Sequence, residues 1–178
     1  MNKKVMVISS TPRSGGNSDV LCDRFVEGAR EAGNTAEKIR LADLSIKYCT
    51  GCGACNRTHR CTQKDDMEGI LETMVAADVI VLATPVYFYT MCAQLKTVID
   101  RTAARYTEVA GKKFYFILTA ADSRKASLER TVEAFRGFLD CLDGSCEKGI
   151  VYGTGAWGIG DIQGSRAMNQ AYEMGKQA

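Results

Sequence analysis

The chain has 178 residues, of which 46% are hydrophobic and 25% charged; this composition is typical of a globular protein and excludes intrinsic disorder. The length predicts one domain over residues 1–178. A net charge of +2 without a basic stripe argues against a nucleic-acid partner, and no apolar run is long enough to cross a membrane. The N-terminus lacks the pattern of a secretory signal, so we expect a cytoplasmic protein.

Apolar runs alternate with segments of helical periodicity along the chain. The alternating pattern at 35–41 predicts a half-exposed edge strand, and buried strands are predicted at 4–9, 78–84, 113–119 and 149–152. The apolar stripes of the predicted helices contain Leu21, Met67, Cys92 and Leu128, and a last helix is predicted over 165–176. This order predicts an α/β fold in which a five-stranded parallel sheet has helices on both faces, a three-layer sandwich.

The first predicted strand is followed by a polar loop that leads directly into a helix. The loop provides hydroxyl, amide and guanidinium groups from Ser10, Thr11, Arg13, Asn17 and Ser18. Such donors at a helix N-terminus suit a phosphate, although a polar turn in which Asn17 or Ser18 caps the helix is an alternative. The lysine of a nucleoside-triphosphatase loop is absent, which argues against that activity.

A second loop is predicted after the third strand, and it contains the consecutive aromatic residues Tyr87, Phe88 and Tyr89. Three adjacent aromatic side chains in a loop cannot all face a core, so we expect them to grip a flat heteroaromatic ligand. A subunit interface is the alternative interpretation, because aromatic residues are also enriched there.

Four of the eight cysteines, Cys49, Cys52, Cys55 and Cys61, have the spacing C-x2-C-x2-C-x5-C. This spacing suits a 4Fe-4S cluster better than zinc, and free or reversibly oxidised thiols are the other interpretation. Three further cysteines on or beside apolar stripes, Cys22, Cys92 and Cys141, are predicted to be buried, and His59 is predicted to be an exposed surface residue.

The segment from Gly153 to Gly158 matches the dinucleotide fingerprint G-x-G-x-x-G. Too few residues follow it to form the strand and helix that the fingerprint requires. We therefore interpret it as a turn-rich segment beside the ligand rather than as a nucleotide-binding loop.

These motifs together resemble the NAD(P)H-dependent FMN reductases and iron–sulfur flavoproteins, which have a flavodoxin-like fold. The resemblance rests on Ser10-Thr11-Pro12-Arg13 with Gly16-Asn17-Ser18, on Pro85-Val86-Tyr87-Phe88 followed by Gln94-Leu95-Lys96 and Asp100-Arg101, and on the cysteine motif. It implies FMN as cofactor, NAD(P)H as co-substrate and the strand order 2-1-3-4-5. It also implies a homodimer or homotetramer.

Position by position, the resemblance assigns the first loop, with Ser10, Thr11, Arg13, Asn17 and Ser18, to the FMN phosphate. It assigns Pro85, Val86, Tyr87 and Phe88 to the flavin ring and the segment from Thr119 to Asp122 to its pyrimidine end. Two residues depart from the family pattern: Ser10 stands in place of a glycine, and Tyr89 in place of a small residue.

The function implied is an oxidoreductase in which NAD(P)H reduces FMN and a small acceptor, such as a quinone or a second flavin, is then reduced by a ping-pong route. One alternative is an iron–sulfur electron carrier with a ferredoxin-like donor. Another is a flavodoxin-like carrier without turnover, which the net charge of +2 disfavours.

Overall fold

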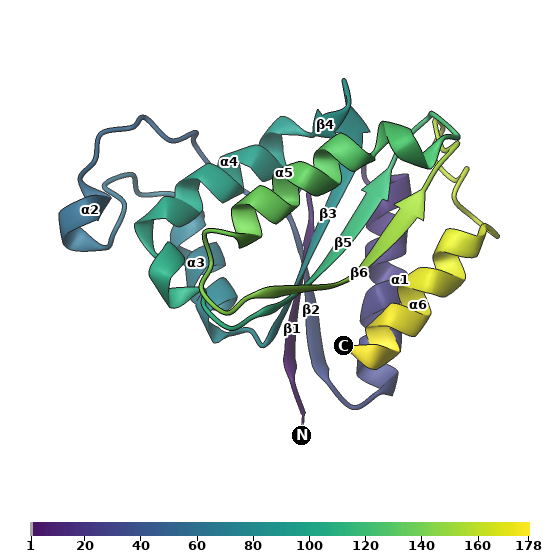
Figure 1. The fold of residues 1–178 in the computed structure, drawn as a ribbon, viewed down its shortest axis with the longest axis horizontal. Helices are drawn as coiled ribbons and strands as arrows, with labels where there is room; N and C mark the ends of the chain where they lie inside the picture. The colour runs from purple at the N-terminus through teal and green to yellow at the C-terminus, as the bar shows by residue number, and fades with distance from the viewer. Residues whose placement is uncertain (1) are drawn as a thin grey trace.

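A computed structural model describes residues 2–178. Its sheet has the order β2-β1-β3-β5-β6, and every neighbouring pair along this path is parallel (Figure 1). The strands are β1 (Lys4–Ser9), β2 (Thr35–Arg40), β3 (Val79–Tyr87), β5 (Lys113–Thr119) and β6 (Cys146–Gly153). The predicted five-stranded order is therefore confirmed. A further strand, β4 (Thr90–Met91), pairs antiparallel with the end of β3.

Helices cover both faces of the sheet, as predicted. The helices are α1 (Asn17–Glu31), α2 (Cys55–Thr58), α3 (Met67–Ala76), α4 (Ala93–Arg101), α5 (Glu129–Leu139) and α6 (Arg166–Gln177). The α1 and α6 helices lie side by side on one face, and α3, α4 and α5 lie on the other (Figure 1). Within residues 2–178, no helix has both the length and the apolar character that a bilayer crossing requires.

The central strands contribute side chains to two hydrophobic cores. In β1, Val5 and Val7 pack with α1 and α6, whereas Met6 and Ile8 pack with the helices of the opposite face. Successive side chains of a strand point to opposite faces, so a strand covered on both sides has a continuous apolar sequence. This explains why β1 and β5 have the bounds that the sequence predicts.

Three details differ from the sequence prediction. The β3 strand continues through Pro85, which pairs in register with Thr119, and ends at Tyr87 rather than at residue 84. The β6 strand begins earlier than predicted, at Cys146. It lies at the edge of the sheet, and its first residues are polar and partly exposed, so they do not form the apolar run from which a strand is predicted. Cys141 is exposed and not buried, since α5 ends at Leu139 before reaching it.

The carboxyl ends of β1, β3, β5 and β6 lie along the same edge of the sheet. The loops that follow these strands therefore meet at one place, although they are far apart in sequence. In open parallel sheets this edge is where ligands bind.

Candidate functional site

A cavity of about 440 Å³ opens at this edge of the sheet, a volume typical of small-molecule sites. Its walls come from the loops after β1, β3, β5 and β6. Nine of the predicted site residues line it, namely Thr11, Arg13, Asn17, Ser18, Pro85, Val86, Tyr87, Phe88 and Thr119. Five further residues line it, and all lie in segments that the sequence points to without naming them singly as site residues: Gly16 in the first loop, Ala120 and Ala121 after β5, and Ala156 and Trp157 in the turn-rich segment after β6.

The N-terminus of α1 presents unused hydrogen-bond donors to one end of the cavity. Ser18 lines the cavity, and its Oγ is buried without a hydrogen-bond partner among residues 2–178. Gly16 is the N-cap and no side chain caps the helix, so the capping roles considered for Asn17 and Ser18 are not observed. The first N–H groups of a helix have no acceptor within it. Backbone N–H groups and an unpartnered hydroxyl at this end fit a phosphate.

Arg13 and Asn17 join the α1 end of the cavity to the segment after β6. Arg13 Nη1 donates to the carbonyl oxygen of Trp157 at 2.9 Å, and Asn17 Nδ2 donates to that of Gly158 at 2.8 Å. Asn17 Oδ1 also accepts from the N–H of Ile162 at 3.3 Å. The Asn17 side chain is therefore engaged in holding this segment, whereas Arg13 is exposed and retains further N–H donors for an anion.

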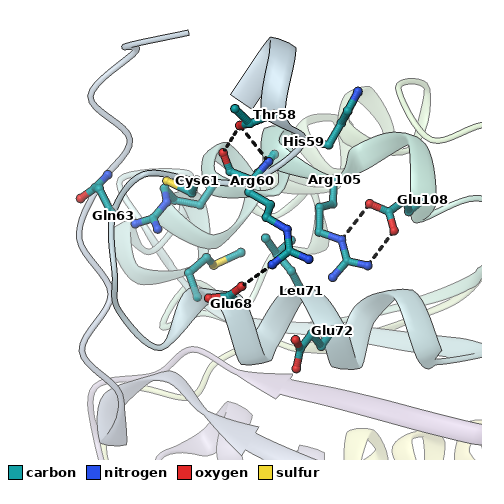
Figure 2. A pocket seen from close by; sticks show the side chains of 13 residues that line it. Thr58, His59, Arg60, Cys61, Gln63, Glu68, Leu71, Glu72, Arg105 and Glu108 are labelled. Carbon is teal, nitrogen blue, oxygen red and sulfur yellow. Dashed lines mark hydrogen bonds and ion pairs between the residues drawn. The ribbon is translucent and has the colours of Figure 1, made fainter. Parts of the chain in front are cut away.

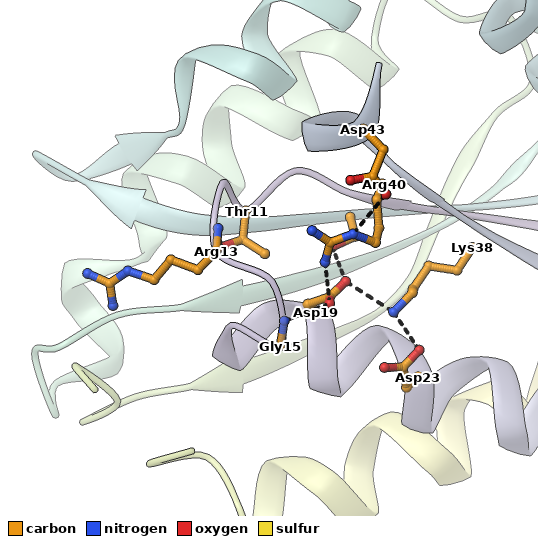
Figure 3. Close-up of polar contacts among 9 residues, drawn as sticks. Thr11, Arg13, Gly15, Asp19, Asp23, Lys38, Arg40 and Asp43 are labelled. Carbon is orange, nitrogen blue, oxygen red and sulfur yellow. Dashed lines mark hydrogen bonds and ion pairs between the residues drawn. The ribbon is translucent and has the colours of Figure 1, made fainter. Parts of the chain in front are cut away.

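A buried carboxylate braces the loop from behind (Figure 3). Asp19 accepts hydrogen bonds from Ser9 Oγ at 2.7 Å and from the N–H of Gly15 at 3.3 Å, and it pairs with Arg40 at 2.6 Å and Lys38 at 3.1 Å. Burial alone would raise the pKa of Asp19, but the hydrogen bond from Ser9 and the two cations outweigh it and lower the pKa. Asp19 is thus ionised and fixes Gly15, whose φ of +63° a side chain would strain.

Ser10 lies beneath the loop rather than in the cavity. Its side chain is buried and its Oγ donates to the carbonyl oxygen of Ala83 at 2.6 Å, while the Cys92 thiol approaches the same Oγ at 3.1 Å. The serine that replaces the family glycine therefore ties the β1 loop to β3. It does not line the cavity.

A strained aromatic hairpin forms the mouth of the cavity. Phe88 and Tyr89 connect β3 to β4 with φ values of 50° and 65°, in the left-handed region that bulky residues rarely adopt. Phe88 is fully exposed, and Trp157, which lines the facing wall, is 75% exposed. Each such backbone outlier costs about 1–3 kcal/mol, so the fold expends free energy to hold aromatic rings at this opening.

The loop after β5 forms a wall of small residues. Thr119, Ala120 and Ala121 line the cavity, but Asp122 does not. The Asp122 carboxylate instead accepts from Arg124 at 2.7 Å and from Ser127 Oγ at 2.5 Å, and these hydrogen bonds hold its pKa well below the ordinary value. Asp122 therefore fastens the loop, and the alanines leave room for a flat ligand.

The four cysteines of the motif lie in a separate loop between β2 and α3. Cys49 and Cys52 are exposed, and Cys55 and Cys61 are half-buried. No group of three or more histidine, cysteine, aspartate or glutamate side chains within residues 2–178 is placed to hold a metal ion. The observed arrangement does not fit a cluster, which requires converging thiolates. His59 is exposed, as predicted.

A second cavity, of about 410 Å³, lies beside this cysteine loop (Figure 2). Two ion pairs lie in its wall: Arg60 lies 3.5 Å from Glu68, and Arg105 binds Glu108 through two hydrogen bonds. Only Cys61 of the four motif cysteines lines it. The cations and carboxylates neutralise one another, so we assign no ligand of particular charge to this cavity.

The segment after β6 contains no helix until Arg166, which excludes a dinucleotide fingerprint at Gly153 and confirms the turn-rich interpretation.

A model of the NADPH-dependent FMN reductase family matches residues 3–157. The chain belongs to this family. The match includes all three loops that the sequence motifs single out.

Two relatives and one solved structure place this FMN reductase family member among known proteins. An iron-sulfur flavoprotein of Methanosarcina thermophila is 32% identical over 138 residues, which cover 76% of this chain and 72% of the relative. One of Archaeoglobus fulgidus is 37% identical over 98 residues, which cover 55% of this chain and 44% of the relative. The structure of an azoreductase from Bacillus anthracis aligns over 100% of both chains, with a TM-score of 0.77 and 16% identity, and it shares the fold.

Proposed function

We propose that this FMN reductase family member binds FMN in the cavity at the carboxyl edge of the sheet and uses NAD(P)H to reduce a small planar acceptor such as a quinone or a second flavin. The observation that carries the proposal is the cavity itself. It has unused phosphate donors at one end, with Ser18 Oγ buried and unpartnered, and an open aromatic mouth at the other.

Each part of the cavity has its own task. Ser18 and the N–H groups in the first turn of α1 bind the phosphate together with Arg13 from the preceding loop. Asp19 fixes the conformation of that loop by accepting a hydrogen bond from Gly15. Pro85 to Phe88 and the wall from Thr119 to Ala121 enclose the ring, which supplies the hydride-transfer chemistry when FMN is bound. No acid or base residue is assigned, because the protein contributes position and electrostatics.

The shared mouth of the cavity predicts the kinetic order. Because Phe88 and Trp157 border a single opening, the dinucleotide and the acceptor must occupy it in turn. Initial rates at several fixed acceptor concentrations should therefore give parallel double-reciprocal lines, the ping-pong pattern. Intersecting lines would show that both substrates bind together and would contradict this order.

The phosphate assignment predicts a selective effect of Arg13→Ala. Removing a charge-assisted contact should weaken FMN by about 1.5–3 kcal/mol, roughly tenfold to more than a hundredfold in Kd. Riboflavin, which lacks the phosphate, should lose much less affinity than FMN, because Asn17 still holds the segment after β6 in the variant. Fluorescence titration of the apoprotein with both ligands measures this, with Arg57→Ala, an exposed residue on α2, as the control. Unchanged FMN affinity in Arg13→Ala would refute the assignment.

A second candidate function, electron transfer through an iron–sulfur cluster from a ferredoxin-like donor, draws support from the cysteine spacing and from the names of the relatives. The arrangement of thiols described above does not favour it. Iron and acid-labile sulfide assays on protein purified without air distinguish the two. Four irons per chain would establish this candidate, and their absence would leave the thiols as free cysteines.

We also propose a cytoplasmic homo-oligomer, a dimer or tetramer. All eight cysteines are free, which suits a reducing compartment. Tyr87, Phe88 and Trp157 expose apolar surface around the cavity mouth that a second subunit would cover.

A further inference from the structure

A cluster of cations lies next to the cavity mouth and has no part in the proposed FMN site. Arg124 and Lys125 follow three and four residues after Ala121, where the small-residue wall ends, and Arg130 lies in the first turn of α5. Arg124 is 72% exposed, and Lys125 and Arg130 are also exposed. The cations therefore adjoin the opening without lining the cavity itself.

Contacts with the aromatic hairpin hold this cluster in position. The Arg130 guanidinium lies 5.4 Å from the centre of the Tyr89 ring, and Thr131 Oγ1 donates to the carbonyl oxygen of Tyr89 at 3.3 Å. The Asp122 carboxylate and, more weakly, the Tyr89 phenol raise the pKa of Arg124. Stacking on a ring limits the motion of a guanidinium, which then loses less entropy when it binds an anion.

The cluster retains donors that no carboxylate satisfies. Asp122 engages Nε and Nη2 of Arg124 and leaves Nη1 without a partner among residues 2–178. Arg130 has no ion pair or hydrogen bond from its side chain within the same residues. Lys125, in contrast, lies over the Tyr152 ring, with its Nζ 4.2 Å from the ring centre.

We propose that Arg124 and Arg130 bind the 2′-phosphate of NADPH and give the protein its preference for NADPH over NADH. The two dinucleotides differ only in this phosphate, which carries close to two negative charges at neutral pH and fits the fork of a guanidinium. In this proposal the nicotinamide occupies the cavity and the adenosine half passes the hairpin at Tyr89, against whose ring Arg130 lies. The inference rests on the proposed function, since it concerns the same cavity.

The other cations near the loops already have partners. Arg13 donates to Trp157 and faces the proposed FMN phosphate, and Lys38 and Arg40 are neutralised by Asp19. Arg130 therefore provides positive charge without a carboxylate partner among residues 2–178, and Arg124 adds the free Nη1 that its ion pair with Asp122 leaves open.

The test compares Arg124→Gln, Arg130→Gln and the double variant with the wild-type holoenzyme. Each single variant should lower kcat/KM for NADPH about tenfold or more and change that for NADH less than about twofold, as expected for a lost charged contact to one phosphate. Calorimetric titration should show a matching loss of affinity for adenosine 2′,5′-bisphosphate and little change for 5′-AMP. Arg57→Gln on α2 is the matched control, and it should leave every value unchanged.

Two results would overturn the inference: equal losses for NADPH and NADH, or unchanged affinity for adenosine 2′,5′-bisphosphate in the double variant. The proposed function has a separate criterion, namely whether the wild-type holoenzyme is reduced by either dinucleotide. A holoenzyme that is reduced but shows no change of selectivity in the variants refutes only the inference.

Discussion

At the residue scale, Asp19 holds the loop between β1 and α1, and its effect on stability should depend on pH. Because its folded pKa is lowered, its contribution is present above the ordinary value of 3.8 and is lost as the pH falls through the folded pKa. Asp19→Asn leaves Lys38 and Arg40 without their buried partner and should cost about 3–5 kcal/mol at pH 7. The difference from wild type should shrink below pH 4.

Urea unfolding of both proteins at pH 7 and pH 3 measures this difference in the free energy of unfolding. Asp23→Asn is the control: Asp23 pairs with Lys38 at 2.6 Å but is 60% exposed, so its loss should cost no more than about 1 kcal/mol. A difference for Asp19→Asn that is as large at pH 3 as at pH 7 would contradict the role assigned to its charge.

A second buried ion pair, between Arg101 and Asp65, connects α4 to the two ends of the cysteine loop. Arg101 forms two hydrogen bonds to Asp65, at 2.9 and 3.0 Å, and a third to the carbonyl oxygen of Lys47 at 2.6 Å. Arg101→Met strands a buried carboxylate and should lower the free energy of unfolding by about 3–5 kcal/mol. The double variant Arg101→Met/Asp65→Leu should be more stable than the single variant. Equal or lower stability of the double variant in urea would show that the pair is not the source of the loss.

At the scale of elements, α1 and α6 pack closely because each has a glycine, Gly28 or Gly175, against the backbone of the other helix. A Cβ added at Gly28 would lie 2.1 Å from the carbonyl oxygen of Tyr172, and one at Gly175 would lie 2.1 Å from that of Phe25. Backbone cannot yield as a side chain can, so Gly28→Ala or Gly175→Ala should each destabilise the protein by at least about 1–3 kcal/mol. Thermal unfolding should show a lower Tm for both variants.

Gly69→Ala provides the matched control for this crossing. Gly69 lies within α3, and nothing would approach its added Cβ within 4 Å. Alanine favours a helix over glycine by about 0.5–1 kcal/mol, so this variant should be as stable as the wild type or more stable. Similar losses of Tm for all three variants would show that the crossing has no special constraint.

The elements differ in how far the sequence predicts them, for physical reasons. The β1 and β5 strands are buried on both faces and therefore have an unmixed apolar pattern with clear ends. The end of β3 was predicted at residue 84, three residues before its observed end at Tyr87, because a proline is normally a sign of a strand's end. The short helix α2 has no periodicity to read, since it contains only four residues.

At the scale of the molecule, the loops that form the site could be predicted where a sequence motif marks them. The contacts between these loops could not be predicted, because they arise only when the chain folds. The loops after β1, β3 and β5 meet because parallel strands end at one edge. The segment from Gly153 to Gly158 was predicted to lie beside the ligand, but the place of Trp157 in the wall depends on the hydrogen bonds from Asn17 and Arg13, which span more than 140 residues. Ser10 and Asp122 turn away from the cavity, and no sequence pattern gives the direction of a single side chain.

The exposed apolar mouth predicts self-association of the whole protein. Phe88 is fully exposed and Tyr87 and Trp157 lie with it around the cavity, so covering this surface should stabilise a dimer or tetramer. Phe88→Ser should shift the mass in solution toward the monomer, as measured by light scattering at several concentrations. The control is Tyr48→Ser, another exposed aromatic residue that lies outside the cavity. A monomeric wild type would contradict the prediction.

The absorption spectrum of protein purified without air, before and after addition of NADPH, tests the central proposal most directly. An FMN-dependent oxidoreductase should show the two bands of oxidised flavin, and NADPH should bleach both, since the hydride reaches a ring held in the cavity. A protein that binds no flavin after reconstitution with FMN, or whose flavin NADPH leaves oxidised, would contradict the account.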